Sequence, residues 1–239
     1  MAGHSKWANI KHRKGAQDAK RGKLFTKLIR LITTAARQYG ADESANSTLR
    51  LAIGKALSAN MTRDTIDRAI KRGAGGEDQQ QLEEMVYEGY GAGGVAVLIN
   101  CLSDNRNRTV GEVRHILSKC GGSLGTQGSV SYLFQKKGIL HFAPDSPEEK
   151  IFAIALEAGA EDIQVYDDTA IEIITDPEQF ELVKKSLEEA NLIPDLAEIT
   201  MLPKLKVDVS GEVQEKVNKL IDLLEDLDDV QDVYTNMEE

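Results

Sequence analysis

The chain has 239 residues, of which 41% are hydrophobic and 28% are charged, and its formal net charge is −10. This composition excludes a chain that is disordered throughout. No run approaches the ~20 apolar residues of a membrane-spanning helix, and the N-terminus has no apolar signal core, so we expect a cytoplasmic protein without a membrane partner. Cys101 and Cys120 are too few for a disulfide scaffold. We expect both to be small core residues without a disulfide.

Positive charge is concentrated at the N-terminal end. Residues 1–37 hold ten Lys or Arg and one acid. Residues 1–72 hold sixteen basic and five acidic residues, a net charge of +11, which leaves −21 for the rest of the chain. Because Lys and Arg neutralise phosphates and release condensed counterions, a basic end on an acidic chain predicts a polyanionic partner.

Helical spacing of apolar residues predicts three helices in this basic part. The first helix begins near Leu24 and stops at residues 39–40, and the second covers residues 44–59. The third follows two cap candidates, Asn60 and Thr62, and is expected to end with Gly73 in the left-handed conformation. The sequence therefore predicts a basic α-helical domain over residues 1–76, followed by a polar, glycine-rich linker.

Beyond the linker, short β-branched runs alternate with helices. We expect strands at residues 85–88, 95–101, 130–134, 139–142, 163–166, 170–174, 197–202, 204–209 and 230–234. We expect helices at residues 109–119, 147–158, 178–190 and 212–227. Asp167-Asp168 is suited to a turn, and Asp145-Ser146-Pro147 is expected to cap a helix with the proline at its first position.

The predicted fold class is α+β and multidomain: an N-terminal three-helix domain followed by two α/β sandwich-like domains. Residues 137–203 have the order βαββαβ and are expected to form an inserted ferredoxin-like domain. The flanking elements cannot bury a core alone. We therefore expect residues 77–136 plus 204–239 to form one discontinuous α+β domain.

Catalytic and metal-binding motifs are not found. The four histidines lie in different elements and no clustered Cys/His spacing occurs, so we predict no catalytic residue, no metal ligand, no cofactor and no small-molecule substrate. Residues 89–94 satisfy GxGxxG but lead into a strand, and we interpret them as a strand connection. The glycine-rich residues 121–129 have two open interpretations, a flexible helix-to-strand turn or backbone N–H groups offered to an anion.

Two clusters suit nucleic acid. The first surrounds the only tryptophan and continues into the first helix: its candidate nucleic-acid-binding residues are Lys6, Trp7, Lys11, His12, Arg13, Lys14, Lys20, Arg21, Lys23, Lys27 and Arg30. Trp7 has two open roles, stacking on a base or anchoring the N-terminus onto the helices.

The second cluster is the run SDNRNRT at residues 103–109, with Arg106 and Arg108 as candidate phosphate contacts. The alternative is structural: Asp104, Asn107 or Thr109 caps the helix and the arginines pair with carboxylates.

The run MAGHSKWANIKHRKGAQDAKRGKLFTKLIR resembles the N-terminal signature of the YebC/PmpR family, and SDNRNRT and GGSLGTQGSVSYLF resemble two further family segments in the same order. The resemblance spans essentially the whole chain. It implies an α-helical N-terminal domain and two α/β domains around a cleft. It also implies nucleic-acid binding, since members are described as DNA-binding transcriptional regulators and mitochondrial relatives act as translational activators.

We therefore expect a non-enzymatic regulatory protein with a nucleic acid as partner. The leading hypothesis is a DNA-binding transcriptional regulator, and the alternative is a translation factor that binds ribosomal RNA or the ribosome. The acidic helix and its end, residues 212–229, have two interpretations, a partner surface or a solvated outer face.

Overall fold

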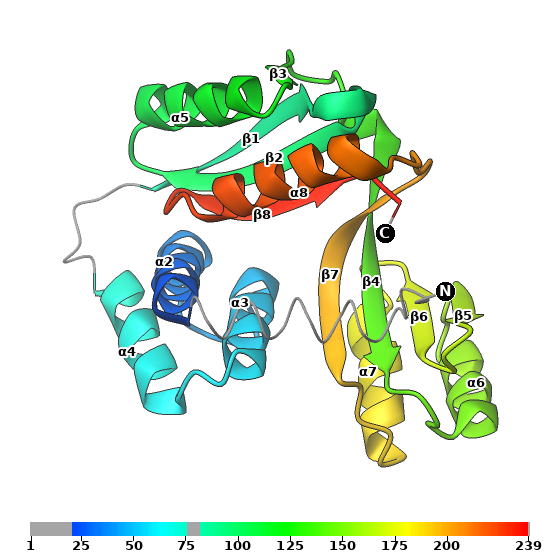
Figure 1. The fold of residues 1–239 in the computed structure, drawn as a ribbon. Coiled ribbons are helices and arrows are strands. Elements are labelled where there is room, and N and C mark those ends of the chain that lie inside the picture. The colour runs from blue at the N-terminus through cyan, green and yellow to red at the C-terminus, as the bar shows by residue number, and fades with distance from the viewer. Residues whose placement is uncertain (1–20, 76–81, 239) are drawn as a thin grey trace. The chain divides into compact units, whose positions relative to one another are not determined.

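The computed structural model describes residues 21–75 and 82–238. These residues form helices and two antiparallel-paired sheets (Figure 1). They divide into two compact units. The main unit consists of residues 22–135 and 202–239, and the inserted unit contains residues 136–201. The α+β fold class predicted from the sequence is confirmed.

The main unit begins with three helices, α2 (Arg21–Tyr39), α3 (Ser47–Ser58) and α4 (Arg63–Ala74). Their apolar faces meet in one core around Ile32, Leu49, Ile53 and Ile66, all with at most 2% of their surface exposed. Asn46 fixes the corner between α2 and α3, because its amide donates to two carbonyl oxygens at the end of α2 while its side-chain oxygen caps α3.

The expected ends of the helices need correction. Gly73 does not end α4 in the left-handed conformation, because the helix continues to Ala74 and Gly75 is the C-cap. A Cβ on Gly73 would lie 2.4 Å from the backbone oxygen of Thr33 in α2. Gly73 therefore permits two helix backbones to approach closely. Asn60 adopts the left-handed conformation after α3, and Thr62 occupies the N-cap of α4 without a side-chain cap bond.

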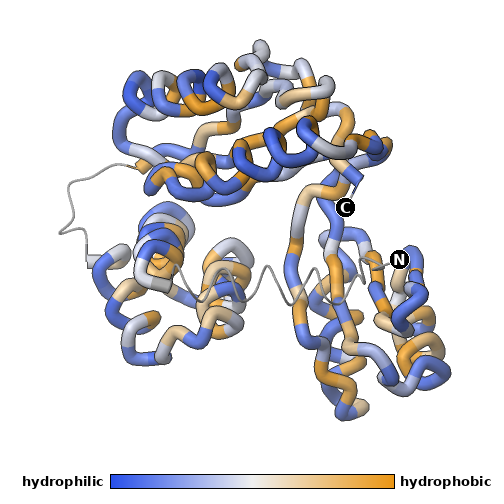
Figure 2. Tube along the Cα trace, viewed as in Figure 1, coloured by the Kyte–Doolittle hydropathy of each residue, from blue (hydrophilic) through white to orange (hydrophobic). Residues whose placement is uncertain are grey.

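The first sheet has the strand order β3-β1-β2-β8. Its strands are β1 (Glu83–Tyr90), β2 (Ala96–Ser103), β3 (Ser123–Leu124) and β8 (Val230–Thr235). Helices α5 (Arg106–Lys119) and α8 (Gly211–Glu225) pack against it and share one apolar core with it. Along α5 and α8 the chain alternates between hydrophobic and hydrophilic residues, as Figure 2 shows.

Two predicted strands are wrong. Residues 130–134 form a short 3₁₀ helix (Ser131–Leu133) before β4, because the backbone N–H groups of Val130 and Ser131 bind a side-chain carboxylate in place of a neighbouring strand. Residues 204–209 make only one isolated bridge, at Val207. Leu205 is 69% exposed and Val209 packs against the core cluster of Val95 and Val217, so the segment has no continuous ladder of strand pairing along it.

The inserted unit is built from six elements. They are β4 (Phe134–Phe142), α6 (Glu148–Glu157), β5 (Asp162–Val165), β6 (Ile171–Thr175), α7 (Phe180–Glu189) and β7 (Leu196–Pro203). The sheet order β5-β6-β4-β7 with this sequence order is the ferredoxin-like arrangement.

Two local predictions in the inserted unit have different outcomes. The turn at Asp167-Asp168 is confirmed, since it joins the antiparallel strands β5 and β6. The predicted cap is wrong: Pro147 is the N-cap of α6, and the Ser146 hydroxyl donates to Ala143 O instead. No described helix is long and apolar enough to cross a membrane.

Candidate nucleic-acid interface

The candidate residues Lys6, Trp7, Lys11, His12, Arg13, Lys14 and Lys20 lie outside the residues that the structure describes. Arg21 is the first residue of α2. The described part of the basic cluster is Lys23, Lys27 and Arg30, which are spaced four and three residues apart and therefore share one face of α2.

All three residues of this face contact the end of α8 and the segment that follows it. Lys27 Nζ donates to Glu225 O at 2.6 Å, and Arg30 Nη1 donates to Asp228 O at 2.9 Å. Lys23 Nζ lies 3.6 Å from a carboxylate oxygen of Asp226. We call residues 225–229 the acidic segment. Cations are favoured at a helix C-terminus, where carbonyl groups are unpaired, so the basic face of α2 stabilises this end of α8.

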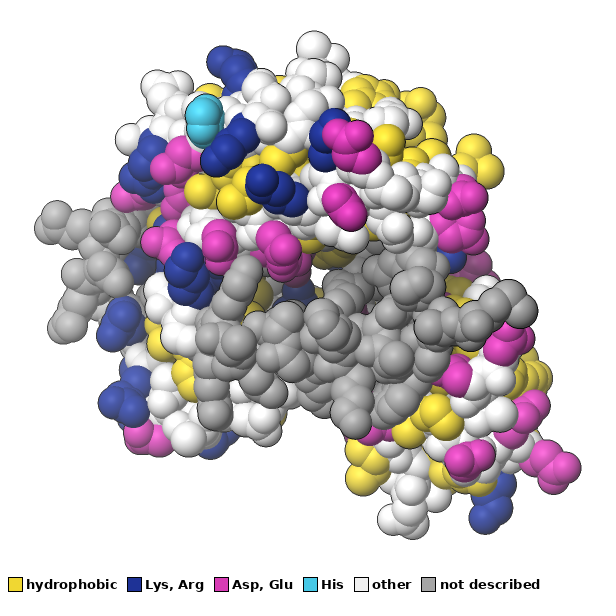
Figure 3. Space-filling model, in the orientation of Figure 1, with side chains coloured by type: hydrophobic (Ala, Val, Ile, Leu, Met, Phe, Trp, Pro, Cys, Tyr) yellow, Lys and Arg dark blue, Asp and Glu magenta, His cyan; other side chains and the backbone are white. Residues whose placement is uncertain are grey.

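Burial affects the cation in the middle of this face. The pKa of Lys27 is below its ordinary value because burial disfavours the charged amine, although Glu225 and Asp228 act in the opposite direction. A shallow polar groove of about 560 Å³ adjoins the contact and is lined by both signs of charge, including Lys23, Arg30, Arg108, Asp226 and Asp229. Figure 3 likewise shows acidic and basic side chains interspersed on the visible face.

Asp229 is the centre of a buried polar network. Its side chain is only 5% exposed. Oδ2 accepts hydrogen bonds from Ser103 Oγ (2.9 Å), Thr109 Oγ1 (2.9 Å) and Arg108 Nη2 (2.8 Å), and Oδ1 accepts one from Arg30 Nη2 (3.2 Å). Burial alone would raise the pKa of Asp229, but these four donors hold it below its ordinary value.

Of the two arginines in the SDNRNRT run, only Arg108 takes part in this network. Arg108 binds Asp229 and also Asp104 at 2.9 Å, and these hydrogen bonds raise its pKa. Arg106 is exposed, and none of the described residues forms an ion pair with it. The helix cap is Asn105, whose side-chain oxygen accepts from Arg108 N at 3.0 Å, so the expected caps Asp104, Asn107 and Thr109 are wrong.

The glycine-rich segment connects helix α5 to strands β3 and β4, as the interpretation as a helix-to-strand turn predicts, and hydrogen bonds hold it in place. The buried Glu88 of β1 accepts the backbone N–H groups of Gly128 (2.7 Å), Val130 (2.7 Å) and Ser131 (2.8 Å). Burial alone would raise the pKa of Glu88, yet these bonds hold it below its ordinary value. These three N–H groups therefore already bind an anion supplied by the protein itself.

Other candidate sites have simple structural roles. Residues 92–94 form a 3₁₀ turn between the antiparallel strands β1 and β2, so the GxGxxG run is a strand connection, as predicted. Cys101 and Cys120 are buried and free, and burial raises the pKa of Cys101 to about 12. Among residues 21–75 and 82–238, no group of three His, Cys, Asp or Glu side chains is placed to hold a metal ion.

Sequence reasoning missed the two buried carboxylates that organise these sites. The sequence contained a signal for Glu88, because an acidic residue within a predicted strand must either face solvent or lie against a loop that offers hydrogen-bond donors. Asp229 had none, because it is one of several acids in a run and only the fold brings Ser103, Thr109 and two arginines to it.

The structure thus defines a multidomain α+β protein with a charge-rich helical region and no recognisable catalytic cluster in its described part. Residues 5–76 match the family model described as the TACO1/YebC protein N-terminal domain, and residues 82–237 match the one described as TACO1/YebC second and third domain. The chain belongs to the TACO1/YebC family.

Three relatives are similar over more than nine tenths of their own length. A "Probable transcriptional regulatory protein" of Hamiltonella defensa is 59% identical over 99% of this chain and 93% of its own length. "Probable transcriptional regulatory protein YebC" of Shigella dysenteriae is 59% identical over 100% and 96%. A solved structure, the conserved hypothetical protein Aq1575 of Aquifex aeolicus, is 47% identical with a TM-score of 0.80 and covers 92% of this chain and 91% of that one. These names place the chain in a family named for regulation.

Proposed function

We propose that this protein is a non-enzymatic, nucleic-acid-binding regulator that acts on transcription by binding DNA. The single observation that carries the proposal is the charge partition: residues 1–72 have a net charge of +11 in a chain of −10. Regulation is also what the names of the relatives state. The basic residues bind phosphates, and these contacts provide most of the affinity in sequence-independent nucleic-acid binding.

The contacts of α2 divide the candidate residues into two groups. Lys23, Lys27 and Arg30 bind the acidic segment, and a polyanion reaches them only by displacing it. We therefore assign the primary phosphate contacts to the cluster around Trp7, with Arg106 as a second contact. Arg108 forms an ion pair with Asp229, so we expect Arg108 to have a structural role.

The experiment uses the full chain with Lys11, Arg13 and Lys14 replaced by Gln. If about six cations meet duplex phosphates, log K falls against log salt with a slope of about −5, and the triple variant reduces this to about −3. A matched control replaces Lys150, Lys184 and Lys185 of the inserted unit by Gln. Equal binding by the triple variant, the control and the unaltered chain would refute the assignment.

The alternative function is a translation factor on ribosomal RNA, because the same cations bind the phosphates of either polymer. Crosslinking in cells, followed by sequencing of both bound DNA and bound RNA, separates the two. Enrichment of promoter DNA supports the proposed regulator. Enrichment of ribosomal RNA replaces it with the alternative.

A further inference from the structure

The loop before β4 and the segment after β7 form a second surface of unusual composition. No aspartate or glutamate occurs between Glu112 and Asp145, or between Glu198 and Asp208, although the chain has 39 acidic residues. These two stretches meet in the main unit, where Lys204 N donates to Leu133 O at 2.8 Å. An acidic protein therefore has one place where two chain segments without acids lie together.

Hydrogen bonds and a close backbone contact with β1 hold the loop of residues 121–133 in place. Besides the three N–H bonds to Glu88, Gly125 N donates to Glu88 O at 2.8 Å and the Tyr90 hydroxyl donates to Ser129 O at 2.9 Å. A Cβ on Gly122 would lie 2.3 Å from Tyr90 O, so the backbones touch. The loop therefore keeps one conformation, and the side chains it presents are preorganised.

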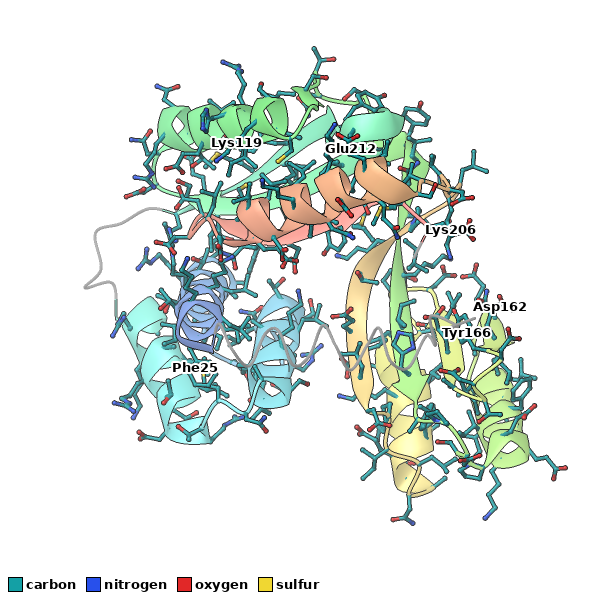
Figure 4. All side chains as sticks on the ribbon, in the orientation of Figure 1. Phe25, Lys119, Asp162, Tyr166, Lys206 and Glu212 are labelled. Atoms are coloured by element: carbon teal, nitrogen blue, oxygen red, sulfur yellow. The ribbon has the colours of Figure 1, made fainter. Side chains whose placement is uncertain are left out.

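The loop and the segment after β7 both present a large apolar side chain to solvent. Tyr132 is 64% exposed and Leu205 is 69% exposed. Lys204 and Lys206 are exposed on either side of Leu205, and no ion pair of either lysine is found within the described residues. Figure 4 labels Lys206 in the segment between β7 and α8. We call Tyr132, Lys204, Leu205 and Lys206 the tyrosine surface.

The chemistry of this surface matches an unpaired nucleic acid strand. An exposed aromatic ring stacks on any base, because every base has a π-face, and nearby lysines contact the backbone phosphates. A duplex hides its bases in the stack and would leave Tyr132 unused. An acidic peptide would use the lysines but has no need of the tyrosine ring.

We propose that the tyrosine surface binds an unpaired stretch of nucleic acid, with Tyr132 stacked on a base and Lys204 and Lys206 on the flanking phosphates. The inference deepens the proposed function and rests on it. It adds a site away from the basic helices and assigns it the single-stranded part of the target. Regulation would then involve a target with both paired and unpaired segments.

The test compares Tyr132→Ala and Tyr132→Phe with Tyr39→Ala in the full chain. Tyr39, at the end of α2, is a matched control because it is 61% exposed. The probes are a twelve-nucleotide oligouridine, the corresponding oligodeoxythymidine and a duplex of the same length. We expect Tyr132→Ala to weaken binding to both single strands about five-fold or more, with Tyr132→Phe and Tyr39→Ala within two-fold. Stronger loss with one single strand identifies RNA or DNA as the target.

Three outcomes would overturn the inference. If the unaltered chain binds and the Lys11, Arg13 and Lys14 variant binds less, but Tyr132→Ala has no effect, the tyrosine surface is not a site while the proposed function stands. If only Lys204→Gln and Lys206→Gln weaken binding, the contact is electrostatic and stacking is wrong. If the unaltered chain binds none of the probes, the proposed function and the inference fail together. Thermal melting of each variant identifies any that fails to fold; if Tyr132→Ala does, Tyr132→Leu, which keeps a large apolar side chain but has no π-face, is compared with Tyr39→Leu under the same expectation.

Discussion

Replacing Glu88 by Gln tests the buried carboxylate that holds the glycine-rich loop. The carboxylate accepts three backbone N–H groups with two oxygens, two of them on Oε2. Gln has only one such oxygen, so at best two bonds remain, both without charge, and the amide NH₂ group faces the third N–H. Weakening two charge-assisted bonds costs about 1 kcal/mol each and one unsatisfied buried donor about 1–3 kcal/mol. We expect a loss of roughly 3–5 kcal/mol.

Urea unfolding monitored by circular dichroism measures this loss, with Glu84→Gln as the control. Glu84 lies on the same strand but is exposed, so its substitution is expected to change the stability by less than about 0.5 kcal/mol. The pKa of Glu88 is lowered in the folded state, so its stabilisation is present above the ordinary carboxyl pKa and is lost as the pH falls through the lowered value. In the Glu88→Gln variant the free energy of unfolding should therefore fall less as the pH is lowered. Equal stability of the two variants at pH 7 would refute the structural role of Glu88.

Two further predictions concern the main unit. Gly73→Ala should destabilise it by roughly 1–2 kcal/mol in the same urea assay, because the clash with α2 outweighs the better helix propensity of alanine. Gly54→Ala in α3 is the control: no atom lies within 4 Å of its new Cβ, so it should stabilise the unit by about 0.5–1 kcal/mol. Asp229→Asn should cost about 1–3 kcal/mol at pH 7, less than a fully buried ion pair because Arg108 and Arg30 can reach water; a stability unchanged from the unaltered chain would show that the network has no energetic role.

The fold could be predicted from the sequence because its signals are local. The βαββαβ order was readable from alternating short β-branched runs and amphipathic helices, and the structure has that order in the inserted unit. The two false strands share one cause. Residues 130–134 and 204–209 have strand-like residues, but a strand also needs a neighbour for its backbone groups, and the neighbour is set by the fold.

The division into three domains stays a prediction. The structure separates the inserted unit, at residues 136–201, from the remainder of the described chain. The three helices and the first sheet fall in one unit, and the contacts between α2 and the acidic segment lie within that unit. No local pattern in the sequence could show that Lys27 faces Glu225, about two hundred residues further along the chain.

The same contacts limit how strongly nucleic-acid binding can depend on the salt concentration. Sixteen basic residues lie in residues 1–72, but several of them already bind carboxylates of the protein: Lys55 binds Asp232, and Arg63 and Arg68 bind acids of the helical region. A cation that exchanges a protein carboxylate for a phosphate must first give up its ion pair, so a paired residue gains less from a phosphate than a cation without a protein partner. The salt slope should therefore report only the cations without a protein partner. This internal competition predicts a slope well short of the roughly −14 expected for sixteen phosphate contacts, and a slope of about −5 corresponds to about six contacts.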